Sequence, residues 1–194
     1  SSEELDAVPF TDANDILKTL VPSYSLSRQP ISDGGTFIRP AQLRGMPTDK
    51  TLVLVNSKRR HRAALVSIGG SGTQGPDIAT IPAIALANVE VLRDGAAALY
   101  GSDAIAGVIN FILKEDTEGA TITSEVGKYY EGDGFLFTTS GNFGVALGES
   151  GFANFSIEYS DQGATSRGVE YCEDWACVDP SSPDFGGFDT TIAG

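Results

Sequence analysis

The sequence has very few of the residues that build catalytic and metal centres. Among its 194 residues are one histidine, two cysteines, one methionine and one tryptophan. A structural zinc site needs four ligands, yet Cys172 and Cys177 lie far along the chain from His61 and do not form a Cys-x-x-Cys pair. The Gly-x-Ser-x-Gly motif of serine hydrolases is also absent. We therefore expect neither an enzyme, nor a bound metal ion, nor a resident cofactor.

Basic residues are scarce as well. The chain has 13 Lys and Arg against 26 Asp and Glu, which gives a formal net charge of −13. Binding to nucleic acid requires a basic surface, so nucleic acid is not an expected partner. No apolar run approaches the ~18 residues of a transmembrane helix. The apolar fraction of 41% is nevertheless high enough for a chain of this length to bury a core.

The charge is divided unevenly along the chain. Residues 1–118 contain 11 basic and 14 acidic residues, a net charge of −3, whereas residues 119–194 contain 2 and 12, a net charge of −10. Such an asymmetry indicates two different environments. We therefore expect two domains, with the boundary between residues 118 and 119.

Residues 1–118 carry signals for both helices and strands. Capping and acidic residues at 11–15 precede apolar positions up to Leu20, and Pro22 then ends the helix. Residues 51–55 form an apolar run of strand length, which predicts a strand buried on both faces. The region is thus predicted to be an α+β domain with a small mixed sheet of three or four short strands. Its other expected elements are a short helix at 81–86, a strand at 89–92, a helical turn at 96–100 and a strand at 107–114.

Residues 119–194 show a different pattern, in which apolar and polar side chains alternate. The alternation covers residues 120–130, 135–146 and 152–160, with short turns between them. This period of two predicts three antiparallel strands of about ten residues. The polar positions are Thr, Ser, Asn and Glu with almost no Lys, which fits an outer-membrane barrel with one face to lipid and the other to the lumen. A soluble sheet also alternates, so the pattern alone leaves both interpretations open.

Two stretches resemble the plug domain of TonB-dependent outer-membrane receptors. The longer is IPAIALANVEVLRDGAAALYGSDAIAGVINFILK, residues 81–114, in which 89–93, 99–101 and 104–110 match the family signature in order and spacing. The shorter stretch lies within residues 43–56. The predicted helix within residues 12–27 is similar to the opening helix of the family.

This resemblance implies a fold. Residues 1–118 would be a globular plug, and residues 119–194 would hold the first three strands of a large transmembrane β-barrel, followed by an acidic extracellular loop. A barrel of 22 strands with ~10 residues each needs about 220 residues before any loop. Because 76 residues follow residue 118, we expect the chain to be a fragment of a receptor.

The resemblance also implies a function. Receptors of this family import a scarce ligand actively across the outer membrane, such as a metal chelate, a cobalamin or an oligosaccharide, and the plug gates the barrel. The implied partners are TonB with its proton-driven inner-membrane motor, the lipid of the outer membrane and the small-molecule or oligosaccharide ligand. The alternative is a surface receptor for signalling or adhesion without transport. A stand-alone soluble α/β domain is a third interpretation.

Two segments of the plug are candidates for contact with the ligand. One is the glycine-rich loop at 69–75, which lacks the Gly-Lys-Ser/Thr ending of a phosphate loop and in the family would project outward. The other is the basic cluster at 58–62, which is either a solvated face or an attractive patch for an anionic ligand or an acidic barrel wall. The residues that we expect to touch the ligand are Arg60, His61, Arg62, Ser71, Thr73 and Gln74.

Other charged residues of the plug are candidates for holding it in the barrel. The resemblance suggests that Arg44 and Arg93, with Glu90 beside them, take part in ion pairing with the barrel wall, and pairing within the plug is the alternative.

The last part of the chain has two further features. Cys172 and Cys177 favour a local disulfide in an oxidising compartment, with two free thiols as the alternative. The acidic residues between 170 and 189 match no calcium-loop spacing, which favours a solvated extracellular loop.

Overall fold

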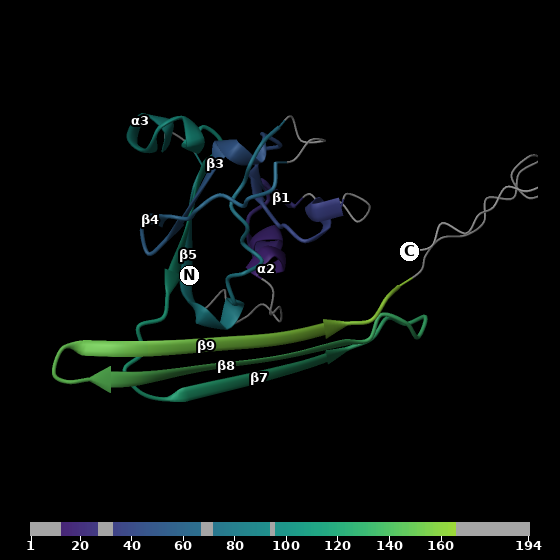
Figure 1. The fold of residues 1–194 in the computed structure, drawn as a ribbon, viewed down its shortest axis with the longest axis vertical. Coiled ribbons are helices and arrows are strands. Elements are labelled where there is room, and N and C mark those ends of the chain that lie inside the picture. The colour runs from purple at the N-terminus through teal and green to yellow at the C-terminus, as the bar shows by residue number, and fades with distance from the viewer. Residues whose placement is uncertain (1–12, 27–32, 67–71, 94–95, 166–194) are drawn as a thin grey trace, which may run out of the picture.

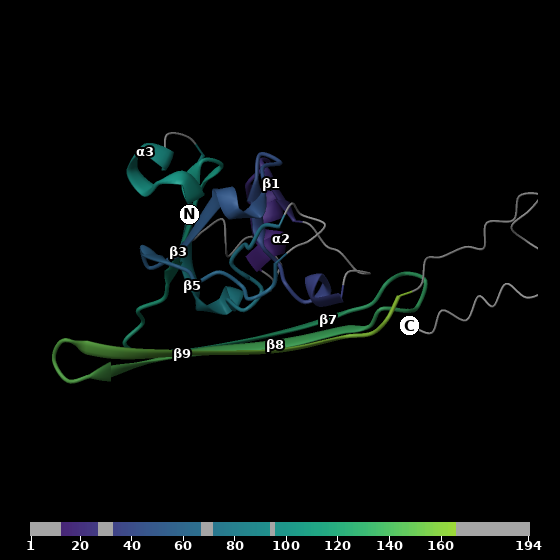
Figure 2. The ribbon, with the colours of Figure 1, turned by 45° about the horizontal axis from the view of Figure 1, so that its top comes forward.

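The computed structural model describes residues 13–26, 33–66, 72–93 and 96–165. Within them, a globular part is followed by a long three-stranded sheet, and the globular part lies against one face of that sheet (Figure 1, Figure 2). We call the described residues up to 118 the plug, and the strands after it the barrel sheet. None of the described helices is long and apolar enough to cross a membrane.

The plug is built on a four-stranded mixed sheet. Its strands are β3 (Thr51–Val55), β4 (Lys58–Arg59), β5 (Leu86–Leu92) and β6 (Gly107–Leu113), in the order β4-β3-β6-β5. The pairing of β3 with β6 is parallel, whereas β4 and β5 pair antiparallel to their neighbours. A mixed sheet with a buried central strand was predicted for this region. Among the described residues the plug has six strands, more than the three or four predicted, because β1 (Tyr24–Leu26) and β2 (Ala41–Leu43) form a separate antiparallel pair.

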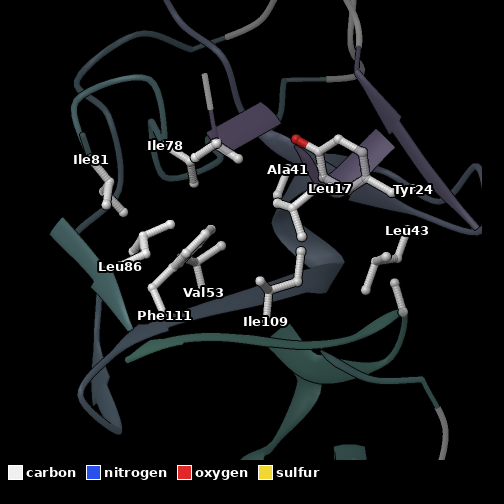
Figure 3. Packing of buried hydrophobic residues seen from close by; sticks show 12 residues of the cluster. Leu17, Tyr24, Ala41, Leu43, Val53, Ile78, Ile81, Leu86, Ile109 and Phe111 are labelled. Atoms are coloured by element: carbon white, nitrogen blue, oxygen red, sulfur yellow. The ribbon is translucent and has the colours of Figure 1, made fainter. Parts of the chain in front are cut away.

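The main core lies between the four-stranded sheet and helix α2 (Ala13–Leu20). Ile109 of β6 points toward Leu17 of α2, and Val53 of β3 and Phe111 of β6 point into the same core toward Ile78 (Figure 3). The Tyr24 hydroxyl donates a buried hydrogen bond to the Asn14 side chain at 2.8 Å. The opposite side chains of the central strands belong to a second, smaller cluster. Its buried members are Leu52, Leu54, Ala104 and Val108. Strand β3 is thus buried on both faces, as predicted.

Short helical segments connect the strands of the plug. They are η1 (Asp33–Thr36), η2 (Thr48–Lys50), η4 (Ala83–Ala85), α3 (Ala96–Tyr100) and η5 (Ser102–Ala104). The short helix expected at 81–86 is a single 3-10 turn, and the strand expected at 89–92 already begins at Leu86. The reason is that buried Leu86 pairs with Leu113 of β6, so the chain becomes extended there. The helical turn expected at 96–100 is present as α3.

One glycine permits the close packing of β6. Gly107 has φ +138°, and a Cβ atom there would lie 2.6 Å from the carbonyl oxygen of Leu92. A side chain would collide with the end of β5, so the position requires glycine.

The barrel sheet consists of β7 (Ala120–Gly127), β8 (Leu136–Leu147) and β9 (Gly151–Gln162) in sequence order, all antiparallel. This confirms the three alternating strands. The pairing aligns residues of one kind, so that Phe143 lies opposite Phe155 with stacked rings 4.9 Å apart, and Asn142 lies opposite Ser156.

The two faces of the barrel sheet differ in chemistry and in surroundings. Thr138, Ser140 and Asn142, at alternate positions of β8, are buried. The plug lies against one face of this sheet (Figure 1), and burial assigns these side chains to that face. On the other face large apolar side chains are exposed, with Ile122 80% and Ile157 73% accessible. The polar face is therefore the inner one, and the outer face is apolar.

Candidate functional site

The basic segment 58–62 leaves the sheet through a tight hairpin turn between β3 and β4. Asn56 and Ser57 form the turn, and both have positive φ angles of 47° and 63°. Side-chain amide oxygens hold this turn. The Ser57 N–H donates to Asn110 Oδ1 at 3.0 Å, and the Leu113 N–H donates to Asn56 Oδ1 at 2.8 Å. The turn is thus attached to β6, which fixes the direction in which the basic segment departs.

Parallel pairing brings two distant segments beside this basic segment. The residues that enter β3 and those that enter β6 lie side by side because Thr51 pairs with Gly107 and the Ala106 N–H donates to the Lys50 carbonyl at 2.9 Å. Asp49 therefore lies near Asp103, and the returning chain joins them where the Arg60 N–H donates to the Val53 carbonyl at 2.9 Å.

These three segments enclose a hollow of about 230 Å³. Arg59 and Asp103 line it, together with Leu52 and Val53 of β3. We refer to it below as the basic hollow. Its other polar side chains are Thr48, Asp49, Thr51, Arg60, His61, Arg62 and Gln74. Four of the six residues expected to touch the ligand thus line one hollow.

Two residues that line the basic hollow, Arg59 and Asp103, form an ion pair. Arg59 donates to Asp103 Oδ2 at 2.6 Å and to the Tyr100 carbonyl at 2.5 Å, and an Arg62 nitrogen lies 3.5 Å from the same carboxylate oxygen. Partial burial acts to raise the pKa of Asp103, but the hydrogen bond and charge of Arg59, helped by Arg62 and Ser102, outweigh it. The pKa of Asp103 consequently lies below its usual value, and the carboxylate stays charged at neutral pH.

Two residues that line the basic hollow each have a buried side-chain atom without a hydrogen-bond partner among the described residues. Arg60 donates through a terminal nitrogen to Thr80 Oγ1 at 2.8 Å, while its Nε is buried and unpaired. Asp49 accepts from Lys50 Nζ at 2.8 Å on Oδ2, while its Oδ1 is buried and unpaired. One free donor and one free acceptor therefore belong to residues that line the same hollow.

The glycine-rich loop contributes to this site through its second half. Thr73 Oγ1 accepts from Thr48 Oγ1 at 3.2 Å, which joins the loop to η2. Gln74 donates to the carbonyls of Ala63 and Ala64 at 3.5 and 3.4 Å. Ser71 lies outside the described residues. The ligand contacts of all six residues remain predictions.

The residues predicted to hold the plug in the barrel are dispersed over the plug. Arg44 donates to the carbonyls of Ile105 and Ala106 at 2.8 and 3.2 Å, so its guanidinium binds the chain that enters β6. Glu90 accepts a hydrogen bond from Asn110 Nδ2 at 3.0 Å. Arg93 is exposed and forms no hydrogen bond or ion pair with another described residue. Pairing with the barrel wall stays a prediction, because the described wall comprises β7–β9.

Sequence reasoning did not find the acidic side of the basic hollow. Neither Asp49 nor Asp103 is among the residues that the sequence analysis proposes for the site. The available signal was charge, since an arginine cluster at 59–62 in a folded domain needs nearby carboxylates. Cys172, Cys177 and the acidic segment 170–189 lie outside the described residues, so their roles stay predictions.

Comparison with known families identifies the protein family of the chain. The family model described as "TonB-dependent Receptor Plug Domain" matches residues 1–108. The chain belongs to this family.

Named relatives of the chain are outer-membrane receptors and transporters. It is 30% identical over 160 residues to the vitamin B12 transporter BtuB of Photobacterium profundum, which covers 81% of this chain and 23% of the relative. It is 34% identical over 119 residues to the iron-regulated outer membrane virulence protein of Vibrio cholerae. This match covers 61% of this chain and 17% of that protein. A third relative is the probable TonB-dependent siderophore receptor PirA of Acinetobacter baumannii, which is 35% identical over 121 residues. This match covers 60% of this chain and 16% of that protein.

Solved receptor structures share the fold. A mutant ferric enterobactin receptor PfeA of Pseudomonas aeruginosa with bound enterobactin matches with a TM-score of 0.60 and 25% identity, over 83% of this chain and 24% of that one. The receptor in complex with BCV-L6 matches with a TM-score of 0.62 and 26% identity, over 83% and 24%. The chain thus spans about a quarter or less of the proteins that it matches.

These findings confirm the predicted family and fold class. The chain is a plug domain with a mixed sheet, followed by antiparallel strands that resemble the barrel of TonB-dependent receptors. The family and the relatives place the protein in the outer membrane. The relatives are transporters and receptors rather than enzymes. The boundary predicted between residues 118 and 119 falls in the link between β6 and β7 and stays a prediction.

Proposed function

We propose that the protein is part of a TonB-dependent active importer that takes a scarce small-molecule ligand across the outer membrane. The observation that supports this most directly is the orientation of the barrel sheet. Its polar face lies against the plug, and its apolar face is exposed. A sheet of this kind fits a barrel wall between lipid and a plugged lumen. The plug would then close the path that the ligand must take.

The ligand would bind on the plug at the side where residues 60–62 and 73–74 meet. Loops held by a rigid scaffold are common places for binding residues, and here the four-stranded sheet is that scaffold. The relatives are named for vitamin B12 and siderophores, which makes cobalamin and ferric siderophores the first ligands to test. TonB and its proton-driven motor would supply the energy, because ligand binding alone cannot drive uptake against a gradient.

The proposal is tested by uptake in cells that express the complete receptor, with and without TonB. Radiolabelled cobalamin and a ferric siderophore serve as probes, and cells without the receptor give the background. We expect uptake of at least one probe that disappears when TonB is deleted while surface binding persists. Uptake that continues without TonB would contradict the proposal, and surface binding without any uptake would support the receptor that does not transport.

A further inference from the structure

A short link joins the plug to the barrel sheet. It consists of residues 114–119, between Leu113 at the end of β6 and Ala120 at the start of β7 (Figure 1). Its first amide, that of Lys114, donates to the Ala85 carbonyl of η4 at 2.9 Å. Since η4 in turn packs against β8 and β9, the link and η4 belong to one region where the plug rests on the described wall.

The end of the link crosses the inner face of β8 at Gly144. The Gly144 N–H donates to the Gly119 carbonyl at 3.1 Å, which extends the pairing of β7 with β8 by one residue. Gly119 has φ +90°, a conformation that favours glycine, and this lets the link turn back over the sheet. The turn brings Asp116 over Gly144, which shares the inner face with Asn142 because the two lie two residues apart in a strand.

This close approach leaves no room for a side chain. A Cβ atom on Gly144 would overlap the carbonyl oxygen of Asp116 and lie 2.5 Å from its carbonyl carbon. These are backbone atoms, so they cannot turn aside as the end of a flexible side chain can. The floor around the glycine is held as well, because buried Asn142 donates to Asn154 and Ser156 of β9. The φ angle of Gly144 is not positive, so space alone requires glycine there.

A second glycine of the same strand provides the contrast. Gly141 lies on the outer face, one step out of phase with the inner residues. A Cβ atom there would meet Ile157 Cγ2 at 3.7 Å and the Thr121 carbonyl oxygen at 3.9 Å, which are ordinary contact distances. Strand β8 therefore has room for a methyl group at 141 and none at 144.

We propose that Gly144 positions the plug against the barrel wall, because its bare backbone lets the link lie flat on β8 and so fixes how closely η4 approaches β8 and β9. In treating the plug as the closure of the barrel, this proposal rests on the function proposed above. A methyl group at 144 lifts the link. Since Lys114 ties the link to η4, η4 moves away from the wall with it, and solutes pass between plug and wall without TonB.

The test measures leakage through the complete receptor in cells that lack TonB, so that driven import does not contribute. Vancomycin, a polar antibiotic too large to cross an intact outer membrane readily, reports the leak, and surface labelling reports the amount of receptor. Gly144→Ala should make the cells more sensitive to vancomycin at an unchanged receptor level. Gly141→Ala is the matched control and should leave them as resistant as cells with the unaltered receptor. Surface-exposed Gly144→Ala without a leak, or an equal leak from Gly141→Ala, would overturn the proposal.

A longer link separates positioning from general stability. One glycine inserted between Asp116 and Thr117 in the Gly144→Ala receptor gives the link the length to pass over the methyl group, so resistance to vancomycin should return. A general weakening of the wall would not be repaired by a change in the link. If Gly144→Ala fails to reach the surface, recovery of the receptor by this insertion supports the proposal. A receptor in which the insertion repairs neither assembly nor resistance overturns it.

The two proposals can fail separately, because the leak is measured without TonB and without a ligand. If a leak is confined to Gly144→Ala but no TonB-dependent uptake is found, Gly144 positions the plug and only the importer falls. If TonB-dependent uptake is found but Gly144→Ala does not leak, the importer stands and the role of Gly144 falls.

Discussion

The plug and the barrel sheet bury side chains of opposite chemistry. In the plug, apolar residues of β3 and β6 such as Val53 and Phe111 are fully buried between the sheet and α2. In the barrel sheet the buried residues of β8 are polar, namely Thr138, Ser140 and Asn142. Large apolar side chains on the other face, such as Phe143, Phe155 and Ile157, are exposed.

This difference indicates that the exposed surfaces of the two regions suit different surroundings. The plug hides apolar area from water, which is the usual driving force of folding. The polar side chains of the barrel sheet bind one another instead, as Asn142 does with Ser156 at 2.8 Å and Thr138 with Ser160 at 2.9 Å. Its exposed apolar face fits a hydrocarbon surrounding. The following predictions test this contrast, from the largest expected effect to the smallest.

The largest effect is expected in the plug core. Phe111 is 0% exposed at the centre of the cluster beneath α2, so Phe111→Ala should destabilise the plug by about 3–5 kcal/mol through lost burial and a cavity. Hydrogen exchange of the amides of β3 and β6 in the complete receptor measures this free energy. Phe111→Leu, which keeps most of the volume, should cost less than half as much. Equal, small effects of both variants would show that the core does not carry the stability of the plug.

A smaller effect is expected from a charge on the outer face of the barrel sheet. Ile157→Lys places an ammonium where the barrel would meet lipid, at a cost of about 2–4 kcal/mol near the midplane. Urea unfolding of the receptor in lipid vesicles should show this loss. The matched control is Thr123→Lys on the inner face of β7, which should be tolerated. Equal tolerance of both lysines would mean that the outer face is not a lipid surface.

The smallest effect concerns the ion pair of Arg59 with Asp103. Because the pKa of Asp103 is lowered in the folded state, its contribution to stability is present above the ordinary aspartate value of 3.8 and is lost as the pH falls through the lower folded value. The pair is about one third exposed on the aspartate side, so its worth is at most about 1 kcal/mol. Thermal melts of the receptor and of Asp103→Asn should therefore differ slightly at neutral pH and converge in acid. If the melting temperatures of the receptor and of Asp103→Asn differed by the same amount at all pH values, the ion pair would not be the cause of the difference.

Much of the fold could be predicted because it depends on local patterns. The apolar run at 51–55, the turn signals around 96–100 and the alternation after residue 119 each specify one element. The element at 81–86 was predicted as a helix because Pro82 and alanines favour helix starts. In the structure only Ala83–Ala85 form a helical turn, and a strand begins at Leu86. The pairing of this strand with β6 outweighs the weak helix propensity of so short a segment.

The candidate site could be predicted only in part. Arg60, His61 and Arg62 are consecutive, so their cluster is visible in the sequence. Asp49 and Asp103 are distant in the chain and meet the arginines only because β3 and β6 pair in parallel and place their entrances together. Which Arg60 and Asp49 atoms remain without partners depends on side-chain packing, which no spacing rule describes.

The sequence by itself determined the family, the two-region organisation and the alternating strands, because motifs, charge and period two are properties of consecutive residues. The tertiary structure decided which face of the barrel sheet lies against the plug and which residues surround the basic hollow. Both depend on contacts between segments far apart in the chain, and such contacts are set by strand pairing and packing of the whole molecule.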